Sequence, residues 1–182
     1  MDQRKIYQIG VIGTFADKKI SVKLNELTRK LGMEIAKRGH ILVFGPELDG
    51  NSLSTEAALG AKEVGGTTVG ILYGSKGKLF SPESADIVIW TGAERGGPRE
   101  SILALSCEGM IAISGGSGTL TEMMVAYMNR RPVVVMERTG GWSDKMVNQF
   151  FDHRKRAKAM GAKTPEEAVE LISNLIQENR NS

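Results

Sequence analysis

The stretch that decides the fold reads Met110-Ile-Ala-Ile-Ser-Gly-Gly-Ser-Gly-Thr-Leu-Thr-Glu122. Its first four residues form a short apolar run typical of a buried strand, and a glycine-rich loop follows at 114–118. A helix is expected from Thr119 to Asn129, and a second apolar run, Pro132 to Met136, comes next. Because parallel strands need a long crossover, which is usually a helix, this order predicts two parallel strands in one sheet.

The same alternation of apolar runs and helical patterns extends along the chain. Further strands are expected at 6–12, 41–44, 67–73 and 86–90, with a weaker candidate at 157–160, and further helices at 21–38, 55–64, from Pro98 onward, at 144–152 and from 164 onward. Strands that are apolar on both faces indicate a sheet covered by helices on each side. The sequence therefore predicts an α/β fold: a doubly wound, Rossmann-like parallel sheet of about six to seven strands, with helices on both faces, in a single domain over residues 1–182.

Composition and charge exclude several classes of protein. The chain has 182 residues, of which 41% are hydrophobic, and 24 basic against 21 acidic side chains give a net charge of +3. An excess this small and dispersed does not favour a nucleic-acid partner. One cysteine and two histidines allow no intrachain disulfide and no recognisable metal cluster. No apolar run approaches the roughly 20 residues of a membrane span, so we expect a soluble, cytoplasmic protein with no membrane partner.

One basic stretch, His153-Arg-Lys-Arg156 with Lys158, lies toward the C-terminal end of the chain. It lacks interleaved aromatic residues, on which the bases of single-stranded nucleic acids stack. We therefore interpret this stretch as a solvated helix end and not as an RNA site.

The glycine-rich loop gives the densest signal for a ligand site. In a doubly wound sheet, ligands bind beyond the carboxyl ends of the strands, where loop 114–118 is expected to lie. Gly115, Gly116 and Gly118 let backbone N–H groups turn toward an anion, and the following helix presents unpaired N–H groups and the positive end of its dipole. The loop lacks the Lys-Ser/Thr of a Walker motif, and the first strand lacks the third glycine of the dinucleotide fingerprint. The sequence thus predicts a phosphate site and does not support nicotinamide binding.

Two charged side chains near this loop each have two interpretations. Thr119 and Glu122 have the spacing of a capping box, but the same carboxylate could act as a base or stabilise a developing cation beside a bound phosphate. Arg99, in the first turn of the preceding helix, is either solvent-exposed or forks onto a phosphate or carboxylate. A cation is unfavourable at a helix start, which favours a specific role for Arg99, whereas Glu100 suits that position without one.

Arg99 is followed, in the next strand–loop–helix unit, by Gly115-Gly-Ser-Gly-Thr119 and Glu122. This pairing resembles the signature of the LOG family, which was once misnamed lysine decarboxylases and is part of the SLOG superfamily. The branch to which the chain is most similar includes the molybdenum cofactor carrier proteins. The resemblance covers most of the chain, from Gly10-Val-Ile-Gly13 through 60–72 to 131–135 and Gly140-Gly-Trp142.

The resemblance implies an activity and a set of site residues. In LOG enzymes, water cleaves the N-glycosidic bond of a nucleoside 5′-monophosphate and releases the base and ribose 5-phosphate. Arg99 and Glu122 would be the catalytic pair, with Glu122 stabilising an oxocarbenium-like ribose and Arg99 keeping that carboxylate ionised. The residues expected to bind the phosphate are Gly13, Thr14, Gly115, Gly116, Ser117, Gly118 and Thr119. No cofactor or metal is implied, and relatives of this kind are usually homodimers or larger homo-oligomers.

Three departures from the family pattern leave a second hypothesis open. The active enzymes carry Pro where this chain has Ser114 and Lys where it has Glu100, and the family's glycine-rich second loop here reads Gly45-Pro-Glu-Leu-Asp-Gly-Asn51. The first hypothesis is a nucleoside 5′-monophosphate phosphoribohydrolase. The second is a non-catalytic carrier that holds a nucleotide or a molybdopterin-like pterin phosphate. The residues alone do not decide between them.

Overall fold

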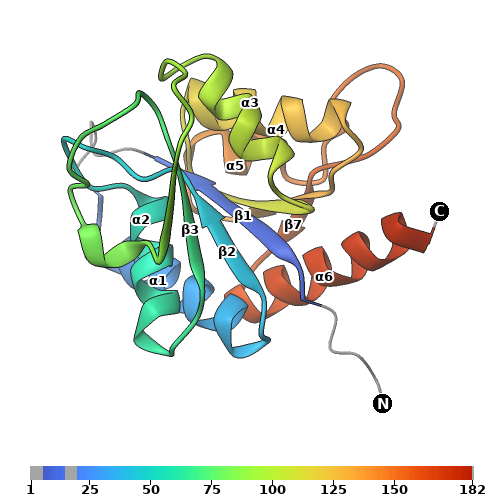
Figure 1. Cartoon of the computed structure of the whole chain (residues 1–182). Coiled ribbons are helices and arrows are strands. Elements are labelled where there is room, and N and C mark those ends of the chain that lie inside the picture. The colour runs from blue at the N-terminus through green and yellow to red at the C-terminus, as the bar shows by residue number, and fades with distance from the viewer. Residues whose placement is uncertain (1–5, 15–19, 182) are drawn as a thin grey trace.

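Seven parallel strands form one sheet in the computed structural model, which describes residues 6–14 and 20–181 (Figure 1). Their spatial order is β4-β3-β2-β1-β5-β6-β7. The bounds are β1 Gln8–Gly13, β2 Ile41–Phe44, β3 Thr68–Leu72, β4 Ile87–Trp90, β5 Gly109–Ile113, β6 Val133–Met136 and β7 Met160–Ala162. The predicted Rossmann-like parallel sheet is thus confirmed.

Helices cover both faces of this sheet. One face carries α1 (Val22–Lys37), α2 (Leu53–Glu63) and α6 (Pro165–Asn181), and the other carries α3 (Pro98–Leu105), α4 (Ser117–Met128) and α5 (Gly141–Met146) (Figure 1). A short 3-10 turn, Pro82–Ser84, precedes β4. Within residues 6–14 and 20–181, no helix combines the length and the apolar composition needed to cross a membrane.

The order of the strands reverses between β1 and β5. The chain winds outward from β1 through β2 and β3 to β4, then returns and places β5 on the other side of β1. Gly13, at the end of β1, is the register partner of Ile113 at the end of β5. In open α/β sheets, ligands bind outside the carboxyl ends of the strands at such a reversal point.

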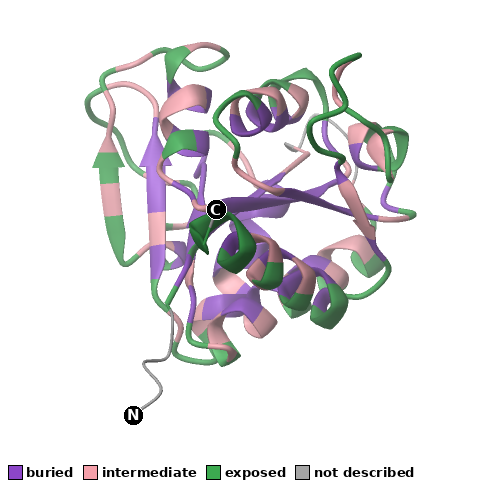
Figure 2. Cartoon of the chain, turned by 90° about the vertical axis from the view of Figure 1, so that its right-hand side faces the viewer, coloured by how far each residue is buried: buried purple, intermediate pink, exposed green. Residues whose placement is uncertain are grey.

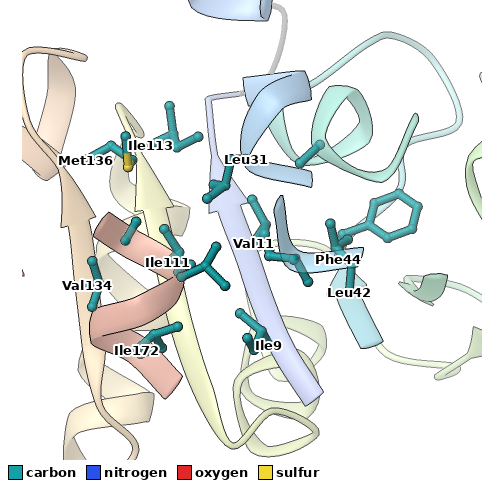
Figure 3. Close-up of a cluster of buried hydrophobic side chains, with 14 of the residues drawn as sticks. Ile9, Val11, Leu31, Leu42, Phe44, Ile111, Ile113, Val134, Met136 and Ile172 are labelled. Atoms are coloured by element: carbon teal, nitrogen blue, oxygen red, sulfur yellow. The ribbon is translucent and has the colours of Figure 1, made fainter. Parts of the chain in front are cut away.

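Alternate residues of the inner strands point to opposite faces and build two hydrophobic layers. On the face covered by α1, α2 and α6, Val11 of β1 and Ile111 of β5 belong to one buried cluster with Leu31 of α1 (Figure 3). On the other face, Ala112 of β5 belongs to a second cluster with Leu103 of α3. Both layers are therefore sealed by helices, and the ends of the inner strands are held firmly in place.

Two expected elements differ in the structure. The helix expected at 144–152 is the shorter α5, because the backbone leaves helical geometry at Val147 (ψ 113°) and Asn148 follows in the left-handed conformation (φ 57°). The strand expected at 157–160 begins instead at Met160, since the backbone of Lys158 forms an antiparallel bridge with Phe150. The basic stretch 153–158 is accordingly part of a loop and not a helix end.

The edge strand β4 is less buried than its apolar run predicts. Ile87 and Ile89 are 51% and 45% exposed, whereas every residue of β5 is buried. Figure 2 shows the edge strand in green and pink beside the mostly purple inner strands. An edge strand has only one neighbour and leaves part of its surface uncovered. An apolar run therefore identifies a strand without showing how deeply the sheet buries it.

Two glycines allow α1 and α2 to pack closely. A Cβ on Gly32 of α1 would lie 1.7 Å from the carbonyl oxygen of Ala57, and one on Gly60 of α2 would lie 2.1 Å from the carbonyl oxygen of Arg29. The two backbones thus approach one another at both points, which only glycine permits. This packing fixes the position of α2 relative to α1.

Replacing Gly60 with alanine is expected to destabilise the protein, although alanine normally stabilises a helix interior by about 1 kcal/mol. The added methyl group cannot fit against the Arg29 backbone, so the helices must move apart, and urea denaturation should show a loss of about 2 kcal/mol in the free energy of unfolding. Gly118 in α4 is the matched control, because a Cβ there would meet no atom within 4 Å. Gly118→Ala should leave stability unchanged or higher, and equal stabilities for the two variants would contradict the close helix packing.

Candidate functional site

A cleft of about 470 Å³ opens at the carboxyl edge of the sheet, beside the reversal point between β1 and β5. Its walls come from the loops that follow β1, β2, β4 and β5 and from the first turns of α3 and α4. The nine residues predicted as a site all lie on the lining of this carboxyl-edge cleft: Gly13, Thr14, Arg99, Gly115, Gly116, Ser117, Gly118, Thr119 and Glu122. The fold therefore brings three distant segments of the chain together in one cavity.

The glycine loop is held in one conformation by hydrogen bonds from three sides. The N–H of Gly115 donates to Thr14 Oγ1 (2.8 Å), and the N–H of Ser114 donates to Thr139 Oγ1 (2.9 Å). The carbonyl oxygen of Gly115 accepts from the N–H of Trp142 (3.0 Å). Thr14 thus braces the loop, because it accepts a backbone hydrogen bond that would otherwise be open to a ligand.

Backbone torsions explain the residues found in this loop. Gly115 has φ +97°, and a Cβ there would lie 2.5 Å from the side chain of Thr119. Ser114 has φ +56°, in the left-handed region that a non-glycine residue rarely adopts. The proline ring locks φ near −65°, so the proline of the active LOG enzymes could not take this conformation. Loop 114–118 therefore follows a path that a proline at position 114 would forbid.

The N-terminus of α4 faces the cleft without a side-chain cap. Gly116 is the N-cap residue and has no side chain to accept from the first turn. The N–H groups of Ser117, Gly118 and Thr119 have no acceptor within the helix, as in any first helical turn. A Cβ on Gly116 or Gly118 would meet open space. Uncapped N–H groups, the helix dipole and free volume together make this turn suitable for an anion.

Arg99 is buried and not solvent-exposed, which excludes the first of its two interpretations. Its side chain is only 6% exposed, and its guanidinium fills the space left by Gly45, where a Cβ would lie 2.1 Å from Nη1. Three carboxylates surround it. The distances are 3.2 Å from Nη2 to Glu100 Oε1, 3.8 Å from Nη1 to Glu122 Oε1 and 3.9 Å from Nη2 to Glu47 Oε1. One buried cation thus neutralises only part of a group of three acids.

Glu100 has a structural role at the start of α3. Its carboxylate accepts from the N–H groups of Gly96 (3.0 Å) and Gly97 (2.8 Å), which cap the helix. Together with the 3.2 Å contact to Arg99, these bonds occupy both carboxylate oxygens. Glu100, which stands where the active LOG enzymes have lysine, therefore binds groups of the protein itself with both oxygens.

Glu122 lies one turn inside α4 and does not form a capping box. The helix begins at Ser117, so Thr119 is already inside its first turn, and the capping-box interpretation of Thr119 and Glu122 is excluded. Glu122 is buried instead, and burial raises its pKa to about 8, although the attraction of Arg99 opposes the shift. Arg99 was expected to keep this carboxylate ionised, but desolvation dominates. Burial thus favours the protonated form of Glu122.

Glu47 is a site residue that the sequence analysis did not identify. It lies in the loop after β2, is buried, and lines the cleft opposite Arg99. Burial raises its pKa to about 7, against the attraction of Arg95 and Arg99. Arg95 Nη2 lies 3.5 Å from Glu47 Oε2, at the mouth of the cleft. Its position three residues beyond the end of β2 is the signal that could have identified it, because that loop reaches the same edge of the sheet.

The cleft thus has two chemically different ends. The first turn of α4 offers backbone donors and a positive dipole to an anion. The other end holds Glu47 and Glu122, two carboxyl groups that gain protons near neutral pH, on either side of Arg99. Such an arrangement can hold a phosphate at one end, and it can donate or accept hydrogen bonds and protons at the other.

Known proteins are similar to this chain in sequence or in structure. A protein of Archaeoglobus fulgidus, described as uncharacterized, is 32% identical over 133 residues, which are 73% of this chain and 82% of the relative. The molybdenum cofactor carrier protein of Chlamydomonas reinhardtii is 30% identical with a TM-score of 0.77, over 95% of this chain and 99% of that one. The molybdenum cofactor binding protein of Rippkaea orientalis is 29% identical with a TM-score of 0.77, over 94% and 98%.

A sequence model of one family matches most of the chain. It is described as the SLOG cluster4 family and matches residues 6–169, from the residues before β1 into α6. The match includes the glycine loop, Arg99, Glu122 and the loop that carries Glu47. On this evidence, the chain belongs to the SLOG cluster4 family.

Proposed function

We propose that the carboxyl-edge cleft binds a small organic phosphate and holds it without cleaving it. The observation that carries this proposal is the uncapped first turn of α4, which opens into the cleft at Gly116 and Gly118. Because the volume of about 470 Å³ is typical of small-molecule sites, it accommodates more than the phosphate group alone.

The protonation of the two buried carboxyl groups supports binding of an anion. Three ionised glutamates would outnumber Arg95 and Arg99 and repel a phosphate, which itself carries up to two negative charges. Burial raises the pKa of Glu122 to about 8 and that of Glu47 to about 7, so much of this negative charge is absent at neutral pH. Neutral carboxyl groups can then donate hydrogen bonds to the rest of the ligand.

The organic part of the ligand is proposed to be a pterin of the molybdopterin type. The two solved structures described above, each similar over most of the chain, are those of proteins that carry or bind the molybdenum cofactor. A pterin ring presents N–H donors and carbonyl acceptors on one edge. Glu47 and Glu122 each lie within 4 Å of Arg99, and the three side chains offer matching acceptors and donors.

A second candidate function, nucleoside 5′-monophosphate phosphoribohydrolase, is favoured by one observation. Arg99 Nη1 lies 3.8 Å from Glu122 Oε1 at the end of the glycine loop, as the resemblance to LOG enzymes implies. Two findings count against this function. The backbone of Ser114 excludes the proline of the active enzymes, and the raised pKa of Glu122 leaves little of the ionised carboxylate that a ribosyl cation needs.

Gly116→Asp is expected to abolish phosphate binding without unfolding the protein. Aspartate is a favourable N-cap residue, so Tm should stay the same or rise, while its carboxylate occupies the place of the anion. Calorimetric titration with a pterin phosphate, and with inorganic phosphate as the minimal probe, should show affinity reduced at least tenfold, equivalent to about 1.4 kcal/mol. Gly116→Ala is the control and should bind more tightly than the aspartate variant. Equal affinities for wild type and Gly116→Asp would refute the proposed phosphate position.

Glu122→Gln is expected to change how stability depends on pH. Burial raises the pKa of Glu122 above that of an unfolded glutamate, about 4.3, so the folded protein binds more protons between about pH 4.5 and 8. The wild type therefore loses stability as pH rises through this window, and the variant, which stays neutral, does not. At pH 9 the Tm of the variant should exceed that of the wild type by on the order of 3 °C, the shift that about 1 kcal/mol gives in a chain of this size.

The comparison at pH 5 and a surface control complete this test. At pH 5 both proteins carry a neutral group at position 122, so their Tm values should agree closely. Glu170→Gln, at an exposed position of α6, should follow the wild type at both pH values. If Glu122→Gln shows the same difference from wild type at pH 5 and pH 9, Glu122 does not have a raised pKa.

A panel of purine and pyrimidine 5′-monophosphates distinguishes the two candidate functions. Under the binding proposal, chromatography should detect no free base even when calorimetry shows stoichiometric binding. Release of base that Glu122→Gln lowers at least 100-fold, and that Glu170→Gln leaves unchanged, would instead establish the hydrolase. Such hydrolysis should accelerate as pH rises through about 8, because the reaction needs the ionised form of Glu122.

A further inference from the structure

A second cavity, of about 490 Å³, lies at the opposite edge of the sheet. Its lining comes from the end of α4, the chain that enters β6, the loop after α5 and the last turns of α6. Because Pro132 and Val133 lie at the amino end of β6, this amino-edge cleft is separated from the carboxyl-edge cleft by the length of the strands. The two cavities have no lining residue in common.

Four cationic side chains line the amino-edge cleft, against one carboxylate. The cations are Arg130, Arg131, Arg156 and Lys158, and the acid is Glu178. In the part of the chain that the structure describes, none of the four cations lies within 4.0 Å of a carboxylate, and Arg131 Nε is buried without a hydrogen-bond partner. The cleft therefore concentrates positive charge that the protein itself does not neutralise.

Asp152, whose side chain contacts the cleft-lining Tyr127, is already engaged. Asp152 accepts a hydrogen bond from the hydroxyl of Tyr127 (2.7 Å) and pairs with Arg154 (3.3 Å). This hydrogen bond to the carboxylate raises the pKa of the Tyr127 hydroxyl, so the phenol stays neutral. Arg154 does not line the cleft, and its charge is balanced by Asp152. The four lining cations thus remain available to an anion from outside.

Aromatic rings form part of the same cavity. Tyr127 and Phe151 are stacked with their centroids 4.8 Å apart and their planes inclined by 16°, and both line the cleft. The sequence places no aromatic residue within the basic stretch 153–158, but the fold brings Phe151 and Tyr127 against it. An apolar and aromatic wall beside a cluster of arginines suits a ligand that joins a flat ring to an anionic group.

Backbone contacts hold this wall in place. Phe150 and Lys158 form an antiparallel bridge across the loop, and the N–H of Ala159 donates to the carbonyl oxygen of Gln149 (3.0 Å). Asn179 Nδ2 of α6 donates to the carbonyl oxygen of Arg130 (2.7 Å). The segments that carry the cations are therefore tied to one another, so the cavity is preformed.

We propose that the amino-edge cleft binds a small aromatic phosphate ester with two or more negative charges, such as a nucleoside diphosphate. Four lining cations match the charge of a diphosphate, and the Tyr127–Phe151 wall offers apolar surface to the base. A volume of about 490 Å³ lies within the range of small-molecule sites. This site is independent of the phosphate site at the N-terminus of α4.

The test uses the full chain with Gly116→Asp, so that the carboxyl-edge cleft is closed to phosphate. Calorimetric titration of this protein with ADP should show one binding site. Adding Arg131→Ala and Arg156→Ala should weaken ADP binding at least tenfold, whereas Arg154→Ala, on the same loop but outside the lining, should leave it unchanged. Lys158→Glu, at an exposed side chain, should also weaken binding at least tenfold and does not disturb the partly buried Arg131.

Two further probes separate the contributions of ring and charge. Adenosine and inorganic pyrophosphate should each bind at least tenfold more weakly than ADP, because each lacks one of the two groups. Absence of ADP binding to Gly116→Asp, or ADP affinity unchanged by Lys158→Glu, would overturn the proposal. Equal affinities for pyrophosphate and ADP would also overturn it. A further contrary result is a change in the molecular mass of the arginine variants, measured by sedimentation, with no change in ADP affinity. That result would assign this face to contacts between copies of the chain.

Discussion

The parallel pairing of β1 with β5 is the interaction on which the rest of the structure depends. It places strands that are separated by most of the chain side by side, and it reverses the direction in which the sheet grows. The loops after these strands therefore separate at the carboxyl edge, and the space between them becomes the cleft. Thr14 then joins the two loops directly, because its hydroxyl accepts from the N–H of Gly115. The glycine loop, the first turn of α4 and the buried glutamates all take their positions from this pairing.

Burial of Arg99 sets the chemistry of that cleft. A buried guanidinium needs partners, since desolvation of an unpaired charge is costly. Glu47, Glu100 and Glu122 supply them, and Arg95 also pairs with Glu47, so three acids lie beside two bases. Burial raises the pKa of Glu47 and of Glu122, which favours proton uptake by this excess of acids. Gly45 has no side chain, which leaves room for the Arg99 guanidinium, because any side chain at position 45 would occupy the same space. Arg99 and Glu122, which match the family signature, are thus part of a larger network that includes Glu47 of the loop after β2.

The sequence predicted most of the fold because the strands of this chain are short apolar runs that glycines separate from amphipathic helices. That the nine candidate residues would meet in one cleft could also be predicted, since loops after parallel strands converge on one edge. What failed depended on contacts between distant segments. The helix expected at 144–152 is found instead at Gly141–Met146, and Thr119 does not cap α4, because α4 starts two residues before Thr119. The burial of Glu47 and the raised pKa of Glu122 depend on neighbours from other loops, and no local pattern encodes them.

The left-handed backbone of Ser114 has a consequence for how this protein can change over evolutionary time. A proline at that position would need φ near −65°, whereas the loop holds φ at +56° and is tied to Thr139 and to the first turn of α5. Gly141 packs directly on the loop, where a Cβ would lie 2.4 Å from the carbonyl oxygen of Gly115. A single substitution therefore cannot convert this loop into the proline form of the active enzymes. The loop with serine and the loop with proline at position 114 differ by a concerted rearrangement of several segments. Single mutations therefore do not easily convert one loop into the other.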